Sequence, residues 1–215
     1  MDRKLIDRTP LIAIAALLAT FLVSIATSAA TPPAGTPTAA TSGKSASEVL
    51  AQITDEEGVL RFDVAEDGTR FLFAPEPVFE DGMPAYGNPF ITQGYIYPAG
   101  TLTESNGVLP DGSPEFPDLV LGEWTCRGWF VGEGAHATTG AWVITTQVYN
   151  FGSEVGDVML IAEGYEVADI GIPSERAITG GTGPFSIARG EGTQTLLGYN
   201  PTMGVNLTME FAPTN

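Results

Sequence analysis

From about residue 57 to the C-terminus, apolar residues tend to recur at every second position rather than at helical spacing. The clearest run is VNLTMEF at 205–211, in which apolar and polar residues alternate without a break. A period of two is typical of a β-strand that buries one face. The pattern therefore predicts a chain built from strands.

Further runs of this kind are separated by connections rich in Gly, Pro, Asp and Ser. The first two, Leu60–Val64 and Arg70–Ala74, are expected to form a hairpin through the turn pair Asp67-Gly68. The remaining strands are expected at 90–97, 119–131, 141–151, 157–167, 176–179 and 185–197. A single short helix is expected before them, at 45–54.

Short connections without crossover helices favour antiparallel pairing between consecutive strands. Six or more long strands favour a sheet that closes on itself, because closure removes the unpaired edges. We therefore predict an all-β fold, with an up-and-down barrel as the simplest form. One connection, Pro98–Asp118, is long and irregular. It is either a lid at one rim of the barrel or a passive excursion over the surface.

The N-terminal residues have a different composition. Basic residues precede an apolar run at 11–25, and small residues follow at 26–30, which is the layout of a secretory signal peptide over 1–30. An uncleaved membrane anchor is the alternative, since the apolar stretch is long enough to span. Residues 31–56, which begin with a stretch rich in Thr, Pro, Ala and Ser, are expected to be a linker, and 57–215 the barrel domain. We expect a secreted or periplasmic protein.

Charge and residue counts exclude several function classes. The chain has 9 Lys and Arg against 26 Asp and Glu, a net charge of −17, so nucleic acid and anionic membrane surfaces are poor partners. It has one histidine and one cysteine, which excludes the usual Cys and His zinc sites. Neither a GxSxG elbow nor a phosphate loop occurs. We expect no metal and no cofactor, and Cys126 is interpreted as a buried apolar residue.

The candidate ligand-binding residues are polar and aromatic side chains on the predicted strands. Glu123, Arg127 and Trp129 share one face of a strand, because they stand an even number of residues apart. They either line the lumen of the barrel as a ligand site or form an ion pair that faces solvent. The candidates on the other strands are Glu163, Tyr165 and Arg189.

The segment AITGGTGPFSIARGEG at 177–192 interrupts the alternation with Gly180, Gly181 and Gly183. It resembles the GGTGxFxxARG signature of dirigent proteins and the related AVTGGSGxF segment of plant allene oxide cyclases. The likeness continues in GWF at 128–130 and GDVML at 156–160. It implies an eight-stranded antiparallel barrel with an apolar lumen, commonly trimeric. The three glycines are expected to form a tight structural turn between two strands.

Together these features predict an exported barrel that binds a small apolar or aromatic molecule. As an enzyme it would be isomerase-like or dirigent-like, guiding stereoselective cyclisation or coupling of a reactive intermediate without a cofactor. The alternative is a non-catalytic carrier or interaction module on the same scaffold. A wide lumen that contains a charged residue or a tyrosine favours chemistry, whereas a lumen filled by side chains favours a structural role.

Overall fold

The computed structural model describes residues 43–214, which form one antiparallel sheet of nine strands with short helical turns between them. The strands are β1 Leu60–Glu66, β2 Leu72–Phe73, β3 Pro89–Pro98, β4 Gly122–Phe130, β5 Ala141–Phe151, β6 Met159–Val167, β7 Pro173–Gly181, β8 Arg189–Tyr199 and β9 Val205–Thr214. From β3 onward, each strand pairs with the next one in the sequence.

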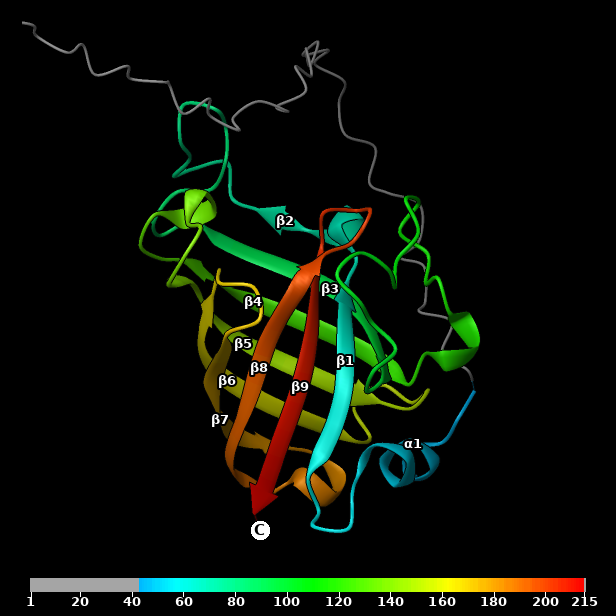
Figure 1. The fold of residues 1–215 in the computed structure, drawn as a ribbon. Coiled ribbons are helices and arrows are strands. Elements are labelled where there is room, and N and C mark those ends of the chain that lie inside the picture. The colour runs from blue at the N-terminus through cyan, green and yellow to red at the C-terminus, as the bar shows by residue number, and fades with distance from the viewer. Residues whose placement is uncertain (1–42, 215) are drawn as a thin grey trace, which may run out of the picture. The chain divides into compact units, whose positions relative to one another are not determined.

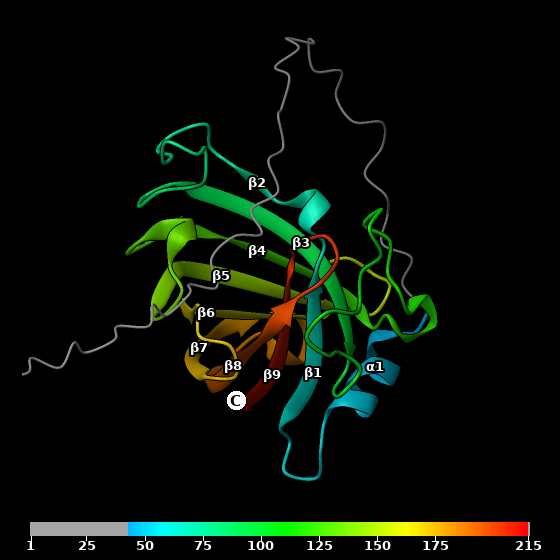
Figure 2. The same ribbon diagram turned by 45° about the horizontal axis from the view of Figure 1, so that its top comes forward.

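The sheet closes because β1 pairs with β9 on one side and with β3 on the other. Strands β1 and β3–β9 therefore make a closed eight-stranded barrel, as the sequence predicts, and β2 pairs only with β3. Figure 1 shows β1, β8 and β9 crossing in front of β3–β7. Figure 2 is tilted toward the end that carries β2, and the barrel strands follow one another around it.

The predicted hairpin of the first two strands is wrong. Both edges of β1 are occupied by β9 and β3, so no edge is left for residues 70–74. The turn pair starts a short helix, η1 Gly68–Arg70, in place of a two-residue turn. The Asp67 side chain caps it by accepting a hydrogen bond from the backbone N–H of Thr69 (3.0 Å). The chain then returns as β2, which pairs with the same edge of β3 as β1 but nearer the N-terminal end of β3, because β4 occupies the other edge.

The one predicted helix is confirmed as α1, Ala46–Ile53. A capping box starts it, in which Ser45 and Glu48 each bond to the backbone of the other. Its apolar face places Val49 and Ile53 in the barrel core. The packed domain thus includes a helix from the range expected to be linker, because those two side chains are apolar and one helical turn apart. The expected signal peptide lies outside the described residues.

None of the helices within 43–214 is long and apolar enough to span a bilayer.

The glycine segment closes the end of the barrel opposite β2. Strand β7 ends at Gly181, and a short helix, η4 Gly183–Phe185, follows it and lies beside α1 in Figure 1. The Phe185 ring is buried against Phe151 in the core. Gly180 and Gly183 have positive φ, +140° and +57°. Such angles favour glycine.

Gly181 has a different reason for being glycine. Its φ is not in the left-handed region, but a Cβ there would lie 1.9 Å from the backbone oxygen of Met159 on β6. The same Cβ would lie 2.8 Å from the Cβ of Phe185. The chain therefore passes too close to its neighbour for any side chain, and the glycine allows Phe185 to fill the end of the barrel.

Aromatic side chains fill this closed end. The ring of Phe62 on β1 contacts those of Tyr149, Phe151 and Phe211, with ring centroids 5.2, 5.5 and 6.0 Å away. All four side chains are fully buried. The contacts with Tyr149 and Phe151 are edge-to-face and that with Phe211 is stacked, and both arrangements are favourable beyond the burial of apolar area alone. This half of the lumen is a packed core, so the space for a ligand is at the other end.

The long connection between β3 and β4 is neither a lid nor a passive excursion. It packs on the outer face of the barrel over Tyr95 and Tyr97 of β3. Their hydroxyls donate to the backbone oxygens of Gly112 (2.8 Å) and Gly107 (2.7 Å). The side chain of Asn206 on β9 donates to two further backbone oxygens of the connection, at 2.9 and 2.8 Å. It therefore seals part of the outer wall.

We expect Gly181→Ala to destabilise the barrel by about 1–3 kcal/mol, because its Cβ overlaps the Met159 carbonyl and must displace β6 or β7. Urea unfolding of the variant measures the loss. The matched control is Ser186→Ala, since Ser186 is exposed in the same connection and its unfolding should be unchanged. A Gly181→Ala variant as stable as the parent would contradict the close approach.

Candidate functional site

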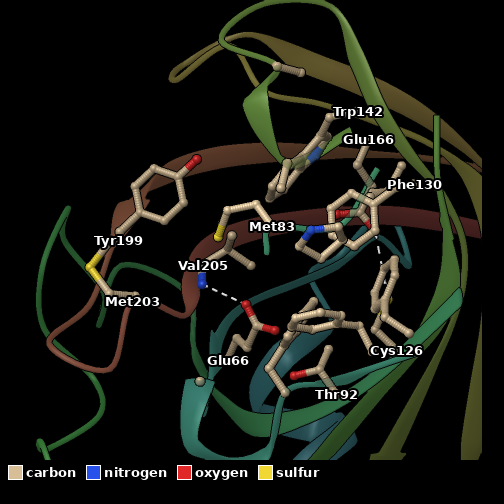
Figure 3. A pocket seen from close by; sticks show the side chains of 18 of the residues that line it. Glu66, Met83, Thr92, Cys126, Phe130, Trp142, Glu166, Tyr199, Met203 and Val205 are labelled. Carbon is tan, nitrogen blue, oxygen red and sulfur yellow. Dashed lines mark hydrogen bonds between the residues drawn. The ribbon is translucent and has the colours of Figure 1, made fainter. Parts of the chain in front are cut away.

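A cavity of about 400 Å³ occupies the lumen at the end of the barrel that carries β2. Its wall is mainly apolar, and its aromatic residues include Phe71, Phe90, Trp124, Phe130, Trp142 and Tyr199. Sulfur atoms of Met83, Met203 and Cys126 and the carboxyl groups of Glu66 and Glu166 add to this lining (Figure 3). Cavities of this size and apolar character are typical of small-molecule sites.

Segment 74–88, which links β2 to β3, contributes part of this wall and is called the lid segment below. Its residues Met83 and Pro84 line the cavity. Asp81 in the lid segment is hydrogen-bonded to His136 in the β4–β5 connection, with Oδ2 and Nε2 2.9 Å apart. Two surface connections thus meet over the cavity, and they reduce its contact with water.

Glu66 is the last residue of β1, and its side chain points into the lumen like those of Leu60, Phe62 and Val64 before it. Its Oε2 accepts a hydrogen bond from the backbone N–H of Val205 (2.8 Å). Burial raises the pKa of the Glu66 carboxyl to about 7, against the opposing effect of its hydrogen bonds. The nearby carboxylates of Glu166 and Asp67 raise it further. Glu66 can therefore gain or lose a proton near neutral pH.

Glu166 on β6 lies deeper and has several hydrogen-bond donors. Its Oε1 accepts from Thr145 Oγ1 (2.6 Å) and Gln147 Nε2 (2.7 Å), and its Oε2 accepts from Gln194 Nε2 (3.0 Å). Gln147 also donates to the side-chain oxygen of Gln194 (2.8 Å). These side chains form a polar layer across the lumen between the aromatic core and the cavity.

Arg176 on β7 supplies the positive charge of this polar layer. Its Nη1 lies 3.5 Å from Glu166 Oε1, and its Nη2 donates to Thr145 Oγ1 (2.8 Å) and to the backbone oxygen of Thr145 (3.2 Å). Arg176 is 1% exposed, and it is not among the residues that line the cavity. The guanidinium therefore compensates Glu166 from behind and presents no charge to a ligand.

The other titratable groups near the cavity remain neutral. Burial raises the pKa of the Cys126 thiol well above its usual value, and the negative charge of Glu166 raises it further. Burial and the charge of Glu66 also raise the pKa of Tyr199. A neutral thiol is a poor nucleophile, which agrees with the interpretation of Cys126 as a buried apolar residue.

The structure places Arg127 and Trp129 on the outside of the barrel, with Trp129 55% exposed. The inward face of β4 instead carries Trp124, Cys126 and Phe130. Side chains on a strand alternate between faces, so the whole odd-numbered set points outward. Glu123 is half-buried on that outer side, and its ion-pair partner is Arg70 (4.0 Å) rather than Arg127.

The candidates on the later strands also lie on the outer face. Glu163 and Tyr165 on β6 are exposed, and the Tyr165 side chain is 55% exposed. Arg189 is exposed at the start of β8, where its Nη1 donates to the backbone oxygen of Ala188 (2.8 Å). The structure therefore does not bring the six sequence candidates together at the cavity.

Sequence reasoning missed Glu66, Glu166 and Arg176. Two of them stand on inward faces next to apolar residues: Glu66 follows Val64 on β1, and Arg176 precedes Ile178 on β7. The signal available for both was a charged residue that stands at the same alternating positions of the strand as the inward-facing apolar residues. Strand β6 has apolar residues in both phases, so its sequence does not separate Glu166 from the outward Glu163.

The described part of the chain contains no cluster of three or more His, Cys, Asp or Glu that could hold a metal ion. The groups that the cavity offers for chemistry are thus the Glu66 carboxyl, which titrates near neutral pH, the aromatic rings of its wall, and the Glu166 carboxylate, which Arg176 compensates. Such a site can bind a small molecule away from water and exchange a proton with it.

No family model matches the chain, and no curated protein matches it. Solved structures that are similar to it include two dirigent proteins and a demethylase. The pterocarpan synthase dirigent protein PsPTS1 is 18% identical over 71% of this chain and 90% of its own, with a TM-score of 0.49. The dirigent protein GePTS1 is 15% identical over 71% and 83%, with a TM-score of 0.45. Pyocyanin demethylase is 16% identical over 73% and 99%, with a TM-score of 0.44. Two of the three are dirigent proteins, a family that the glycine segment resembles.

We expect Arg176→Met to destabilise the protein by about 3–5 kcal/mol, because Glu166 would keep a buried charge without its partner. The double variant Arg176→Met with Glu166→Gln should recover much of that loss, and urea unfolding measures both. Arg127→Met is the matched control, because Arg127 is exposed and none of the ion pairs found in 43–214 includes it. A double variant no more stable than the single one would contradict the pairing.

The raised pKa of Glu66 predicts a pH-dependent stability. The folded state holds the Glu66 proton up to about pH 7, whereas the unfolded chain releases it near pH 4.5. This contribution is fully present below pH 4.5, falls as pH rises, and is lost above about pH 7, with a total of about 3 kcal/mol.

Glu66→Gln stays neutral, so we expect it to match the parent in acid and to be more stable than the parent at about pH 8. Free energies of unfolding measured across this pH range test the expectation. Glu191→Gln, which removes an exposed outer carboxylate, should follow the parent throughout. A constant difference between Glu66→Gln and the parent at every pH would show that Glu66 titrates normally.

Proposed function

We propose that this protein binds a small, largely apolar molecule in the lumen of its barrel and exchanges a proton with it through Glu66. The observation that carries the proposal is a fully buried carboxyl with a pKa of about 7 in the wall of an aromatic cavity of about 400 Å³. A general acid or base works best when its pKa lies near the working pH. A filled lumen would have favoured a structural role instead.

The reaction class that fits is a cofactor-free rearrangement, such as isomerisation or cyclisation of a reactive intermediate. Proton transfer from or to Glu66 would start or end the rearrangement. The aromatic walls would hold the molecule in one conformation, so that one stereoisomer forms. The backbone N–H of Val205 holds one carboxyl oxygen of Glu66, and the Thr92 hydroxyl also stabilises the carboxylate. The carboxyl lines the cavity, where a ligand can reach it.

A non-catalytic carrier is the second candidate, and the predominance of apolar lining favours it. The two functions differ in what Glu66 does. In an enzyme, Glu66→Gln would remove turnover even when the ligand is bound, whereas in a carrier no turnover exists to remove. Export and a homotrimer are further parts of the proposal. Intact mass of the exported chain tests cleavage near residue 30, and mass measurement under native conditions tests the assembly.

Binding in the lumen is tested with the neutral fluorophore N-phenyl-1-naphthylamine. Ala137 lines the cavity from the β4–β5 connection, whereas Thr139 is exposed nearby and does not line it. We expect Ala137→Trp to weaken binding by about tenfold or more, because the new ring occupies the site, and Thr139→Trp to bind like the parent. Equal binding by both variants would place the fluorophore elsewhere and sink the proposal.

Turnover is tested with whatever molecule co-purifies, identified by mass spectrometry and returned to the protein. The parent should convert it, and Glu66→Gln should convert it about 100-fold more slowly or worse at a concentration that saturates the site. Glu66→Asp, which keeps an acid, should retain part of the rate. Recovery of the molecule unchanged after incubation with the parent would favour the carrier.

A further inference from the structure

The ionisable groups that line the cavity include carboxylic acids but no basic side chain. Two of the residues that line it are carboxylic acids, Glu66 and Glu166, and none of the lining residues in the described chain is Lys, Arg or His. The nearest buried cation, Arg176, is used by Glu166 and Thr145 behind the polar layer. Once Glu66 loses its proton, the cavity therefore contains one negative charge that no protein cation balances.

The charged groups on the other side of Glu66 do not change this balance. Asp67 follows it in the chain and is paired with Arg70, with Oδ2 and Nε 2.9 Å apart. Arg70 lies against the Tyr95 ring on the outer face and is not among the lining residues. Cys126 and Tyr199 have raised pKa values and stay neutral. Glu66 thus has carboxylates, a thiol and a phenol around it, and no free positive charge.

The walls add a second attraction for positive charge. Rings from five elements of the chain surround the cavity, and the face of an aromatic ring attracts cations, especially where water is excluded. Thioethers of Met83 and Met203 stand at the same site (Figure 3). The net charge of −17 on the whole chain further raises the local concentration of cations over anions.

We propose that the ligand of the lumen is a flat aromatic cation, one that carries its positive charge on or next to a ring and pairs it with the carboxylate of Glu66. This inference rests on the proposed function, because it names the class of molecule for the same cavity. Planarity follows from the seven aromatic rings among the 20 lining residues, between which a flat molecule can stack, and the single charge follows from the single uncompensated carboxylate. Anionic aromatics are excluded by the same carboxylates.

Two probes of the same shape separate charge from hydrophobicity. N-Methylquinolinium is permanently cationic, and 1-methylnaphthalene is its neutral counterpart, so neither titrates. We expect the cation to bind the parent about tenfold more tightly than the neutral probe at about pH 8, by equilibrium dialysis or calorimetry. At about pH 5.5, where Glu66 is protonated, most of that preference should disappear. 1-Naphthoate, the anionic analogue, should bind more weakly than either.

Variants connect the preference to Glu66. In Glu66→Gln the preference for the cation should fall to the smaller part that the rings supply, and it should be the same at both pH values, because the carboxylate is gone and the rings remain. Glu191→Gln removes one negative charge from the outer face, the same change in net charge, and should keep the parent's preference and its pH dependence. Weaker cation binding in both variants would mean that the overall charge of the protein, and not the cavity, sets the preference.

The outcomes distinguish this inference from the proposed function. Equal affinity for cation and neutral probe, or a preference for the anion, would overturn the inference and leave lumen binding intact. If the cation fails to bind while N-phenyl-1-naphthylamine binds in an Ala137→Trp-sensitive manner, the inference is again wrong and the cavity remains a site. If none of the probes binds in the lumen, both the inference and the proposed function are wrong.

Discussion

The buried pair of Arg176 and Glu166 is the constraint on which the interior of this barrel depends. Both charges lie almost without access to water, and each is compensated by the other and by side chains from neighbouring strands. Desolvating two charges is costly, so the pair persists only where every strand that contributes a partner keeps its register. The layer built on this pair divides the lumen into a packed aromatic core at one end and a cavity at the other.

The Glu66 carboxyl is much less compensated than that of Glu166, although the two carboxyl groups line one cavity. Glu166 has an arginine and the side-chain donors of Thr145, Gln147, Gln194 and Cys126, whereas Glu66 has a backbone N–H and one hydroxyl and no arginine. Burial with so little compensation is why the Glu66 pKa is raised to about 7. A buried carboxyl that ionises near pH 7 lowers the stability of the fold at neutral pH. Such a loss of stability is typical of a functional site, where activity needs a group that a more stable fold would replace.

Two connections of the barrel have different roles: one seals part of the outer wall and the other covers the cavity. The long β3–β4 connection is hydrogen-bonded to Tyr95, Tyr97 and Asn206, and it shields the outer wall behind the cavity. The lid segment after β2 lies over the cavity itself and is joined to the opposite connection through Asp81 and His136. Both leave the closed sheet intact, because neither competes for a strand edge. One connection thereby shields the outer wall, and the other covers part of the cavity's mouth, where Met83 and Met203 remain exposed.

The sequence by itself determined the fold class and nearly every strand, because a period of two and glycine-rich turns are local signals that each segment carries alone. It also determined the helix at Ala46–Ile53 and the structural role of the glycine segment. Only the tertiary structure decided which face of each strand looks inward. On β4, Glu123, Arg127 and Trp129 form as plausible a set as Trp124, Cys126 and Phe130, and burial selects the second. The tertiary structure also decided against the hairpin at Asp67-Gly68, because β9 and β3 occupy both edges of β1. It likewise decided the pKa of Glu66, which depends on neighbours from strands far away in the sequence. Parity, edge occupancy and burial are properties of the assembled barrel, so no single segment contains them.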